Sequence, residues 1–267
     1  MRRSLRSSIR RRRVLPSLML SRFGVPVALV VAWFVTTAAG IVKPYQFASP
    51  SAVLAELTDL ASRGELWANV LASIERVGIG FGLALVLAVV IGAAVGSSRT
   101  AERAIDPTLQ ALRAVPSLAW VPLLLLWLGI GETAKVTLVA IGAFFPIYVA
   151  LVTGIHGVDR KLIEVARLLG VRGVRLAASV LVPATLPTLL VGMRIGLTQA
   201  WLFLVAAELL GATKGLGFLL TDGQQTARTD EIFVAILLFA VCGKLSEVGL
   251  RAIERRAVGW ADTVVTA

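Results

Sequence analysis

The side chains that carry most enzyme chemistry are scarce in this chain of 267 residues. It has one cysteine, Cys242, and one histidine, His156, which excludes an internal disulfide and a multi-histidine metal site. The phosphate-binding loop of ATPases needs two glycines separated by four residues and followed by Lys and Ser or Thr. No segment fits that pattern, and residues 211–215 do not qualify. The sequence therefore predicts no catalytic residues, no metal site and no cofactor bound by this chain.

Charged side chains are the remaining candidates for chemistry. A group of them lies in the segment 154–182, between long apolar runs. Asp159 can cap a helix at its start. Gly170 suits a left-handed helix end, and Pro183 is expected to stop a second short helix. One face of the first helix would be apolar, because residues spaced three and four apart share a face: Leu162, Val165, Ala166 and Leu169. Such a helix pair either covers the membrane bundle or docks into a groove of another protein.

The same segment carries a longer motif. It reads Glu164-Val-Ala, three residues, Gly170, nine residues, then Val180-Leu-Val-Pro183. It resembles the EAA loop of bacterial ABC importer permeases, which reads Glu-Ala-Ala, three residues, Gly, nine residues and Ile-x-Leu-Pro. In that family the loop docks the ATP-hydrolysing subunit. The resemblance implies that the ATPase-docking residues are Glu164, Val165, Ala166, Leu168, Leu169, Gly170 and Pro183.

Other segments resemble one branch of that family. Residues 113–132, 142–148 and 206–218 look like permeases for aliphatic sulfonates, nitrate or taurine, and Gly243-Lys-Leu-Ser246 fits the sulfonate branch best. The resemblance implies alternating access, a second permease copy, two ATP-binding subunits that use ATP and Mg, and an extracytoplasmic solute-binding protein. A homodimer is the habit of this subfamily, and a heterodimer with a sister permease would also supply two docking loops.

The substrate pathway has fewer markers. Arg194 interrupts an apolar run, and a charge there usually faces the bundle interior or water. It is a candidate for an anion path with Gln199 and Trp120, although it could also bond carbonyls at a kink or reach the surface. Trp120, Trp127 and Trp201 are otherwise expected in the interfacial belt. Glu208 and Asp222 are candidates for an external gate in a segment that could equally be an ordinary re-entrant loop.

Composition places the chain in a membrane. Its residues are 57% apolar and 16% charged, with a mean hydropathy of +0.83, whereas soluble proteins are about 25% charged. The net charge of +11 does not indicate nucleic acid, because eight of the 27 basic residues lie in the first 22 positions. A basic block before an apolar stretch keeps the N-terminus of an inner-membrane protein in the cytoplasm; cleavage of this stretch as a signal peptide is disfavoured by its length.

We predict an all-α integral membrane protein with the six-helix ABC importer permease fold. The uncharged runs are 23–42, 77–98, 114–131, 136–158, 187–207 and 232–250. Segments assigned to the cytoplasm carry +8, +1, +3 and +1, and the external ones carry −1, 0 and −2. The chain would thus divide into a basic tail (1–22), a first span (23–42), an external loop and surface helix (43–76), a core (77–250) containing the coupling loop (154–182), and a cytoplasmic tail (251–267).

Two local patterns support helix packing at the second span. Gly78 and Gly82, and likewise Gly92 and Gly96, lie four residues apart, which lets helices approach closely in lipid. Glycine is also simply common in membrane helices. Before that span, Ser49 is a plausible N-cap for a surface helix, with proline at the first helical position.

Three other classes of protein compete with the importer permease. A secondary transporter would use intramembrane acids or inverted repeats, and a membrane enzyme would need clustered His, Asp or Glu. Neither feature is evident in the sequence. A channel would leave the docking segment unexplained.

Overall fold

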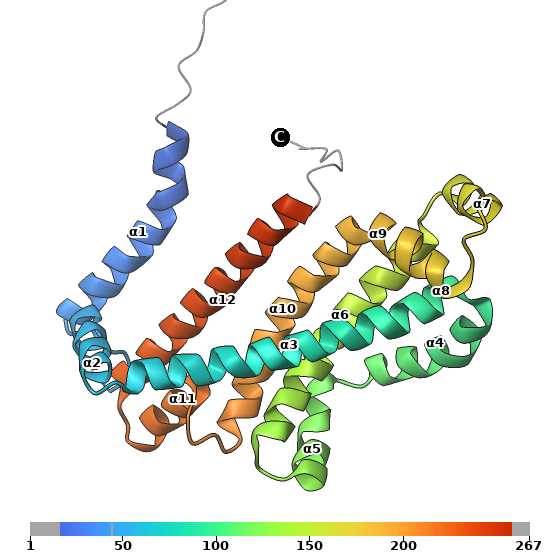
Figure 1. The fold of residues 1–267 in the computed structure, drawn as a ribbon. Helices are drawn as coiled ribbons and strands as arrows, with labels where there is room; N and C mark the ends of the chain where they lie inside the picture. The colour runs from blue at the N-terminus through green and yellow to red at the C-terminus, as the bar shows by residue number, and fades with distance from the viewer. Residues whose placement is uncertain (1–16, 44, 258–267) are drawn as a thin grey trace, which may run out of the picture.

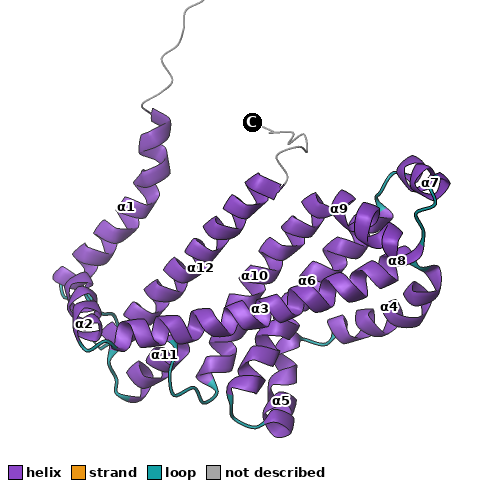
Figure 2. Cartoon of the chain, viewed as in Figure 1, coloured by secondary structure: helices purple, strands orange, loops and turns teal. Residues whose placement is uncertain are grey.

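The computed structural model describes residues 17–43 and 45–257, and this part of the chain is helical with short connections and no strand (Figures 1 and 2). Residues 1–16 and 258–267, which include most of the predicted N-terminal tail and the end of the C-terminal tail, lie outside it. The elements are α1 (Ser17–Ala38), α2 (Pro50–Ser62), α3 (Glu65–Ser97), α4 (Arg99–Ala114), η1 (Ser117–Trp120), α5 (Val121–Leu128), α6 (Glu132–His156), α7 (Arg160–Leu168), α8 (Gly173–Leu176), η2 (Ala177–Leu181), α9 (Val182–Ala184), α10 (Leu186–Leu209), α11 (Leu216–Gln225) and α12 (Thr229–Ala257).

The long apolar helices confirm the all-α membrane fold. In the described residues, four helices are long and apolar enough to cross a bilayer: α3, α6, α10 and α12. A fifth candidate is the broken pair of α4 and residues 118–128, which meet at 86°. The apolar part of α1, residues 24–38, is a shorter helix.

The prediction of one continuous span over 114–131 was wrong. The chain leaves α4 through Val115 and Pro116 in extended conformation, makes the short η1 turn, and forms α5, which ends at Gly129 with φ +74°. Pro116 and Pro122 cause the break, because proline has no N–H to donate and crowds the preceding turn. Proline is favoured in the first turn of a helix, and both short helices begin beside one.

The predicted surface helix is divided in two. Ser49 caps α2 as expected, since its Oγ accepts a hydrogen bond from the N–H of Ala52 at 3.2 Å, with Pro50 at the first helical position. However, α2 ends at Ser62, and Gly64 turns the chain with φ +75°. Residues 65–75, assigned to the surface helix, instead form the first turns of the long helix α3. Because this stretch contains Glu65 and Glu75, the sequence did not indicate that it continues into the following span.

The core forms where α3 and α10 pack on α6. Small residues allow the close approach of α3: a Cβ added at Gly80 would lie 2.6 Å from Cγ1 of Val139, and one at Gly96 would lie 2.8 Å from Cδ1 of Ile155. Gly92 similarly abuts Leu151 at 3.0 Å. The packing role predicted for the glycine pair at 92 and 96 is confirmed. A Cβ added at 78 or 82 has nothing within 4 Å among the described residues, so neither glycine packs against another described helix of the same chain.

This difference between neighbouring glycines gives a matched test. We expect Gly80→Val to lower the free energy of unfolding by about 1–3 kcal/mol, because the new side chain would overlap Val139 on α6. Gly82→Val, two residues further on, has nothing within 4 Å of its Cβ and should change stability by under about 0.5 kcal/mol. Thermal unfolding of the two purified variants in detergent compares them. Equal losses would contradict the packing described here.

Candidate functional site

The loop between α6 and α10 is built around a well-capped helix, α7. The Oδ1 atom of Asp159 accepts a hydrogen bond from the N–H of Lys161 at 2.9 Å. At the other end Gly170 adopts φ +79°, and the N–H groups of Gly170 and Val171 donate to the carbonyls of Arg167 and Ala166, each at 3.0 Å. This pair of bonds closes the helix with a left-handed glycine. The predicted cap at Asp159 and the predicted turn at Gly170 are both present.

The apolar side chains at the C-terminal end of α7 point away from the bundle. Leu168 and Leu169 are 87% and 77% exposed, and Val165 is also exposed. Of the four residues expected on one apolar face, only Ala166 is buried. Figure 1 shows α7 at the edge of the molecule, beyond the ends of α3 and α6. The described part of the chain therefore leaves this face uncovered.

Pro183 does not stop the second short helix as predicted. The chain runs from α8 through a π-helical turn, η2, into α9, and Pro183 lies in the first turn of α9. Residues 173–184 are helical without a break, and the π-helical turn lies just before Pro183, where the missing N–H and the proline ring disturb the regular ladder. The chain redirects two residues later at Thr185, which is buried and whose hydroxyl donates to the carbonyl of Val182 at 2.9 Å.

The inner side of the loop borders a polar cavity of about 580 Å³, between α7 and the junction of α3 with α4. Its lining includes Glu164 and Arg167 from α7, with Arg99 and Glu102 from α4. His156 lies there too, 3.6 Å from Glu102. Glu164 thus faces the body of the protein, while Leu168 and Leu169 face outward.

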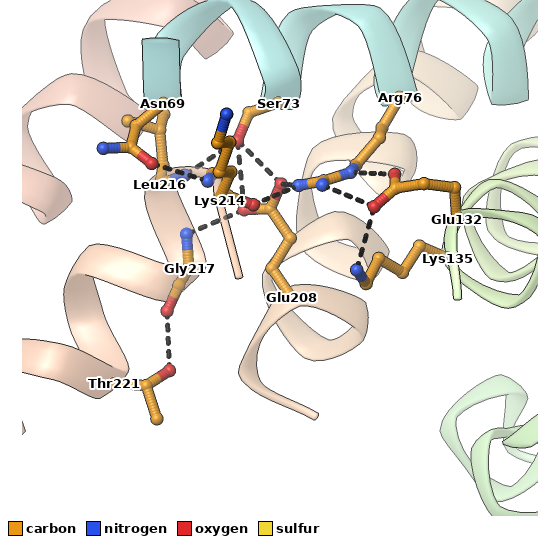
Figure 3. Close-up of polar contacts among 11 residues, drawn as sticks. Asn69, Ser73, Arg76, Glu132, Lys135, Glu208, Lys214, Leu216, Gly217 and Thr221 are labelled. Atoms are coloured by element: carbon orange, nitrogen blue, oxygen red, sulfur yellow. Dashed lines mark hydrogen bonds and ion pairs between the residues drawn. The ribbon is translucent and has the colours of Figure 1, made fainter. Parts of the chain in front are cut away.

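At the opposite end of the molecule a second polar site is buried (Figure 3). Its centre is Glu208, the penultimate residue of α10, whose side chain is 0% exposed. Its carboxylate accepts hydrogen bonds from the hydroxyl of Ser73 at 2.7 Å, from Nη1 of Arg76 at 2.5 Å and from the N–H of Gly217 at 2.7 Å. A buried carboxylate is stable only with partners of this kind.

Three side chains of α3 meet the connection between α10 and α11. Asn69, Ser73 and Arg76 lie on one helix face, since their spacing is four and three residues. Oδ1 of Asn69 accepts from the N–H of Gly215, and the hydroxyl of Ser73 accepts from the N–H of Leu216, each at 2.8 Å. The carboxylate of Glu208 accepts from the N–H of Gly217. Three consecutive N–H groups at the start of α11 therefore donate to side chains of other helices.

Arg76 extends the network to α6. It donates to both oxygens of Glu132, at 2.5 Å and 2.7 Å, and to the carbonyl of Lys214 at 2.6 Å. Lys135 donates to Glu132 at 3.0 Å. The positive charges of Arg76 and Lys135 are balanced by the carboxylates of Glu132 and Glu208. Through these bonds the buried guanidinium of Arg76 connects α3 to α6 and α10.

Glycine is required where the connection passes this network. A Cβ on Gly215 would lie 2.5 Å from Nη1 of Arg76 and would also overlap Glu208. The backbone there has φ +128°, which L side chains rarely adopt. Gly217 is similarly confined, because its Cβ would overlap the side chain of Glu208.

Residues 80–259 match the family described as binding-protein-dependent transport system inner membrane component. The chain belongs to this family. It is therefore a permease of an ABC importer and a multi-pass protein of the inner membrane. The match begins inside α3 and ends beyond α12, so it covers the loop between α6 and α10, and it begins after Asn69, Ser73 and Arg76 of the buried network.

Relatives extend the similarity over most of the permease. A Bacillus subtilis protein described as the aliphatic sulfonates transport permease SsuC is 40% identical over 89% of this chain and 86% of its own length. The Escherichia coli taurine transport system permease TauC is 34% identical over 90% of each chain. The nitrate import permease NrtB of Synechocystis is 33% identical, over 66% of this chain and 64% of its own.

A solved structure shares the fold. A crystal structure of the MetNI methionine ABC transporter in an inward-facing conformation contains a chain that aligns with this one with a TM-score of 0.62 and 20% identity. The alignment covers 71% of the permease and 94% of that chain.

The structure places the predicted external-gate residues apart. Glu208 was expected in an external loop, but it lies buried at the end of α10. Asp222 is half-buried on α11 and takes no part in the network around Glu208. Sequence reasoning missed Asn69, Ser73 and Arg76 entirely. The available signal was their spacing on one helix face immediately before an apolar run.

The three predicted pathway residues of the permease also lie apart. Arg194 pairs with Glu254 in the last turn of α12, and its side chain is 34% exposed. Trp120, at the end of η1, lines an apolar groove between α3, α4 and α6. Gln199 is half-buried on α10. Trp201, expected in the interfacial belt, is instead a core residue that is only 8% exposed.

Proposed function

We propose that this permease forms the membrane path for aliphatic sulfonates, driven by a separate ATPase through alternating access. The observation that carries the proposal is the similarity to SsuC proteins, at 40% identity in Bacillus subtilis and 38% in Escherichia coli, over 89% and 88% of this chain. The weaker similarity to taurine and nitrate permeases makes those solutes the second candidates.

The exposed leucines of α7 support docking of an ATPase on this loop. Leu168 and Leu169 project from a helix that is capped at both ends. Two exposed apolar side chains on a rigid helix fit a hydrophobic groove of a partner. Glu164, Val165, Ala166, Gly170 and Pro183 would hold the shape of the loop or line its base. ATP and Mg would be used by the partner, so this chain would be a non-catalytic subunit.

One docking loop in each chain implies two permease chains for two ATPase subunits. We propose a homodimer, and a heterodimer with a sister permease satisfies the same count. The charge balance of the connecting segments supports a cytoplasmic docking loop and cytoplasmic termini. The end that holds Glu208 and α11 would then face outward, where a solute-binding protein delivers the substrate. Asp222 would lie on that outer face. Together with Glu208, which anchors the start of α11, it would form the external gate.

Growth of a deletion strain tests the substrate. We expect loss of growth on alkanesulfonates as sole sulfur source, restored by this gene on a plasmid, with normal growth on sulfate. Taurine as sulfur source and limiting nitrate are tested in parallel. Loss on taurine or nitrate alone would overturn the sulfonate assignment and keep the importer. Complementation by a Gly170→Val variant, which is strained at φ +79°, should fail.

A further inference from the structure

A cavity of about 260 Å³ lies between α10 and α12. From α10 it is lined by Arg194, Thr198 and Trp201, which follow one helix face. From α12 it is lined by Lys244 and Glu247 and by apolar groups that include Phe239 and Ala240. The ring of Phe239 meets that of Trp201 edge-on, with centroids 6.3 Å apart.

Two buried donors in this cavity lack acceptors. Among residues 17–43 and 45–257, four buried side-chain atoms have no hydrogen-bond partner, and two of these are carboxylate oxygens. The other two are donors, Nε of Arg194 and Nε1 of Trp201, and both residues line this one cavity. A buried donor without a partner is costly, so such groups normally bond protein, water or a ligand.

The surrounding charge favours an anionic ligand. Arg194 pairs with Glu254, while Lys244 and Arg251 both pair with Glu247. Of the residues that line the cavity, Arg194 and Lys244 are cations and Glu247 is the one carboxylate, so the lining carries one net positive charge. Nε–H groups of arginine and tryptophan can only donate, so the missing partner must supply an acceptor.

The depth of the site favours a solute over a lipid headgroup. Arg194 lies eight residues after the start of α10, and Trp201 lies eight residues before its end. Each is roughly 12 Å from the nearer end of the helix at 1.5 Å per residue. Headgroups lie at the ends of a span, whereas a permeating solute must pass its middle.

We infer that this cavity binds the oxyanion head of a small amphiphilic anion, with the sulfonate oxygens on Nε of Arg194 and Nε1 of Trp201. The apolar wall formed by Leu197, Phe239 and Ala240 would take the alkyl part. The choice of a transported sulfonate as occupant rests on the proposed function. The pocket itself rests on the two unpaired donors.

Trp201→Phe is the sharpest variant, because it removes the N–H and keeps an aromatic ring in the core. Trp127→Phe is its control, since Trp127 is 65% exposed on α5 and outside the cavity. Binding of trifluoromethanesulfonate to the purified full chain in detergent can be followed by fluorine NMR line broadening. We expect Trp201→Phe to bind roughly tenfold more weakly than both wild type and Trp127→Phe, the effect of losing one hydrogen bond to a charged group.

Equal binding by Trp201→Phe and Trp127→Phe would overturn the proposal and leave water as the partner of the donors. Titration of phosphatidylglycerol against phosphatidylcholine separates the two sources of an oxyanion. If only phosphatidylglycerol displaces the probe from wild type, the oxyanion pocket stands and its occupant is a lipid headgroup. The growth experiment is independent of this one: a strain that grows normally on sulfonates defeats the proposed substrate, while NMR still decides the pocket.

Discussion

Replacing Arg76 with methionine is expected to lower the free energy of unfolding by about 3–5 kcal/mol, the largest loss we predict for one side chain. Glu208, which is 0% exposed, would lose its cation. Glu132 and the carbonyl of Lys214 would lose donors as well. Thermal unfolding of the purified protein in detergent, or the amount that accumulates in membranes, measures the effect.

Arg63→Met is the control for this prediction. Arg63 is 41% exposed beyond α2 and also pairs with carboxylates, so its removal should cost about 0–1 kcal/mol. Removing Glu208 together with Arg76, as a double methionine variant, should recover part of the loss, because no buried charge is then left alone. Recovery will be incomplete, since Gly217 also needs the carboxylate of Glu208. Equal losses for Arg63→Met and Arg76→Met would contradict the role of the network.

Leu168→Glu is expected to abolish co-purification of the ATPase and to reduce sulfonate uptake at least tenfold. The side chain is 87% exposed, so the substitution should leave the stability of the permease itself unchanged. A charge buried in an apolar groove would be strongly unfavourable for binding. The measurements are pull-down of the ATPase from solubilised membranes and uptake of labelled ethanesulfonate by the complemented deletion strain.

Leu54→Glu provides the matched control for docking. Leu54 is an exposed leucine on α2, which lies at the end of the molecule opposite α7 (Figure 1). The ATPase should still co-purify with this variant. If Leu168→Glu retains the ATPase as well as Leu54→Glu does, α7 is not the docking helix.

The sequence predicted best where a single physical rule governed the outcome. Apolar length identified α6, α10 and α12 to within a few residues, apart from the continuation of α12 to Ala257. Backbone rules identified the caps at Ser49 and Asp159 and the turn at Gly170. Prolines were less predictable. The chain breaks at Pro116 and Pro122, whereas Pro146 lies inside α6 without ending it, and Pro183 lies just before the end of the helical stretch 173–184.

The buried network could not be predicted because it depends on pairing between distant segments. Glu208 reads as a loop residue in sequence, since it is followed by Gly and Thr. Its burial follows from Arg76, which lies 132 residues earlier on another helix. Arg76 in turn was assigned to the external segment 43–76, because the uncharged run of the next span begins one residue later. Neither charge indicates a core position until the two are seen together.

The spacing of the Arg76 partners also orders events during synthesis. Glu132 follows Arg76 by 56 residues and Glu208 follows it by 132, so the ribosome delivers Glu132 first. Elongation at about 5–20 residues per second separates the two by several seconds. During that interval Glu132 is the carboxylate available to neutralise the guanidinium as α3 and α6 enter the bilayer. Glu132 is 61% exposed, whereas Glu208 is fully buried, so the less buried carboxylate is the one that can hold the charge until α10 arrives.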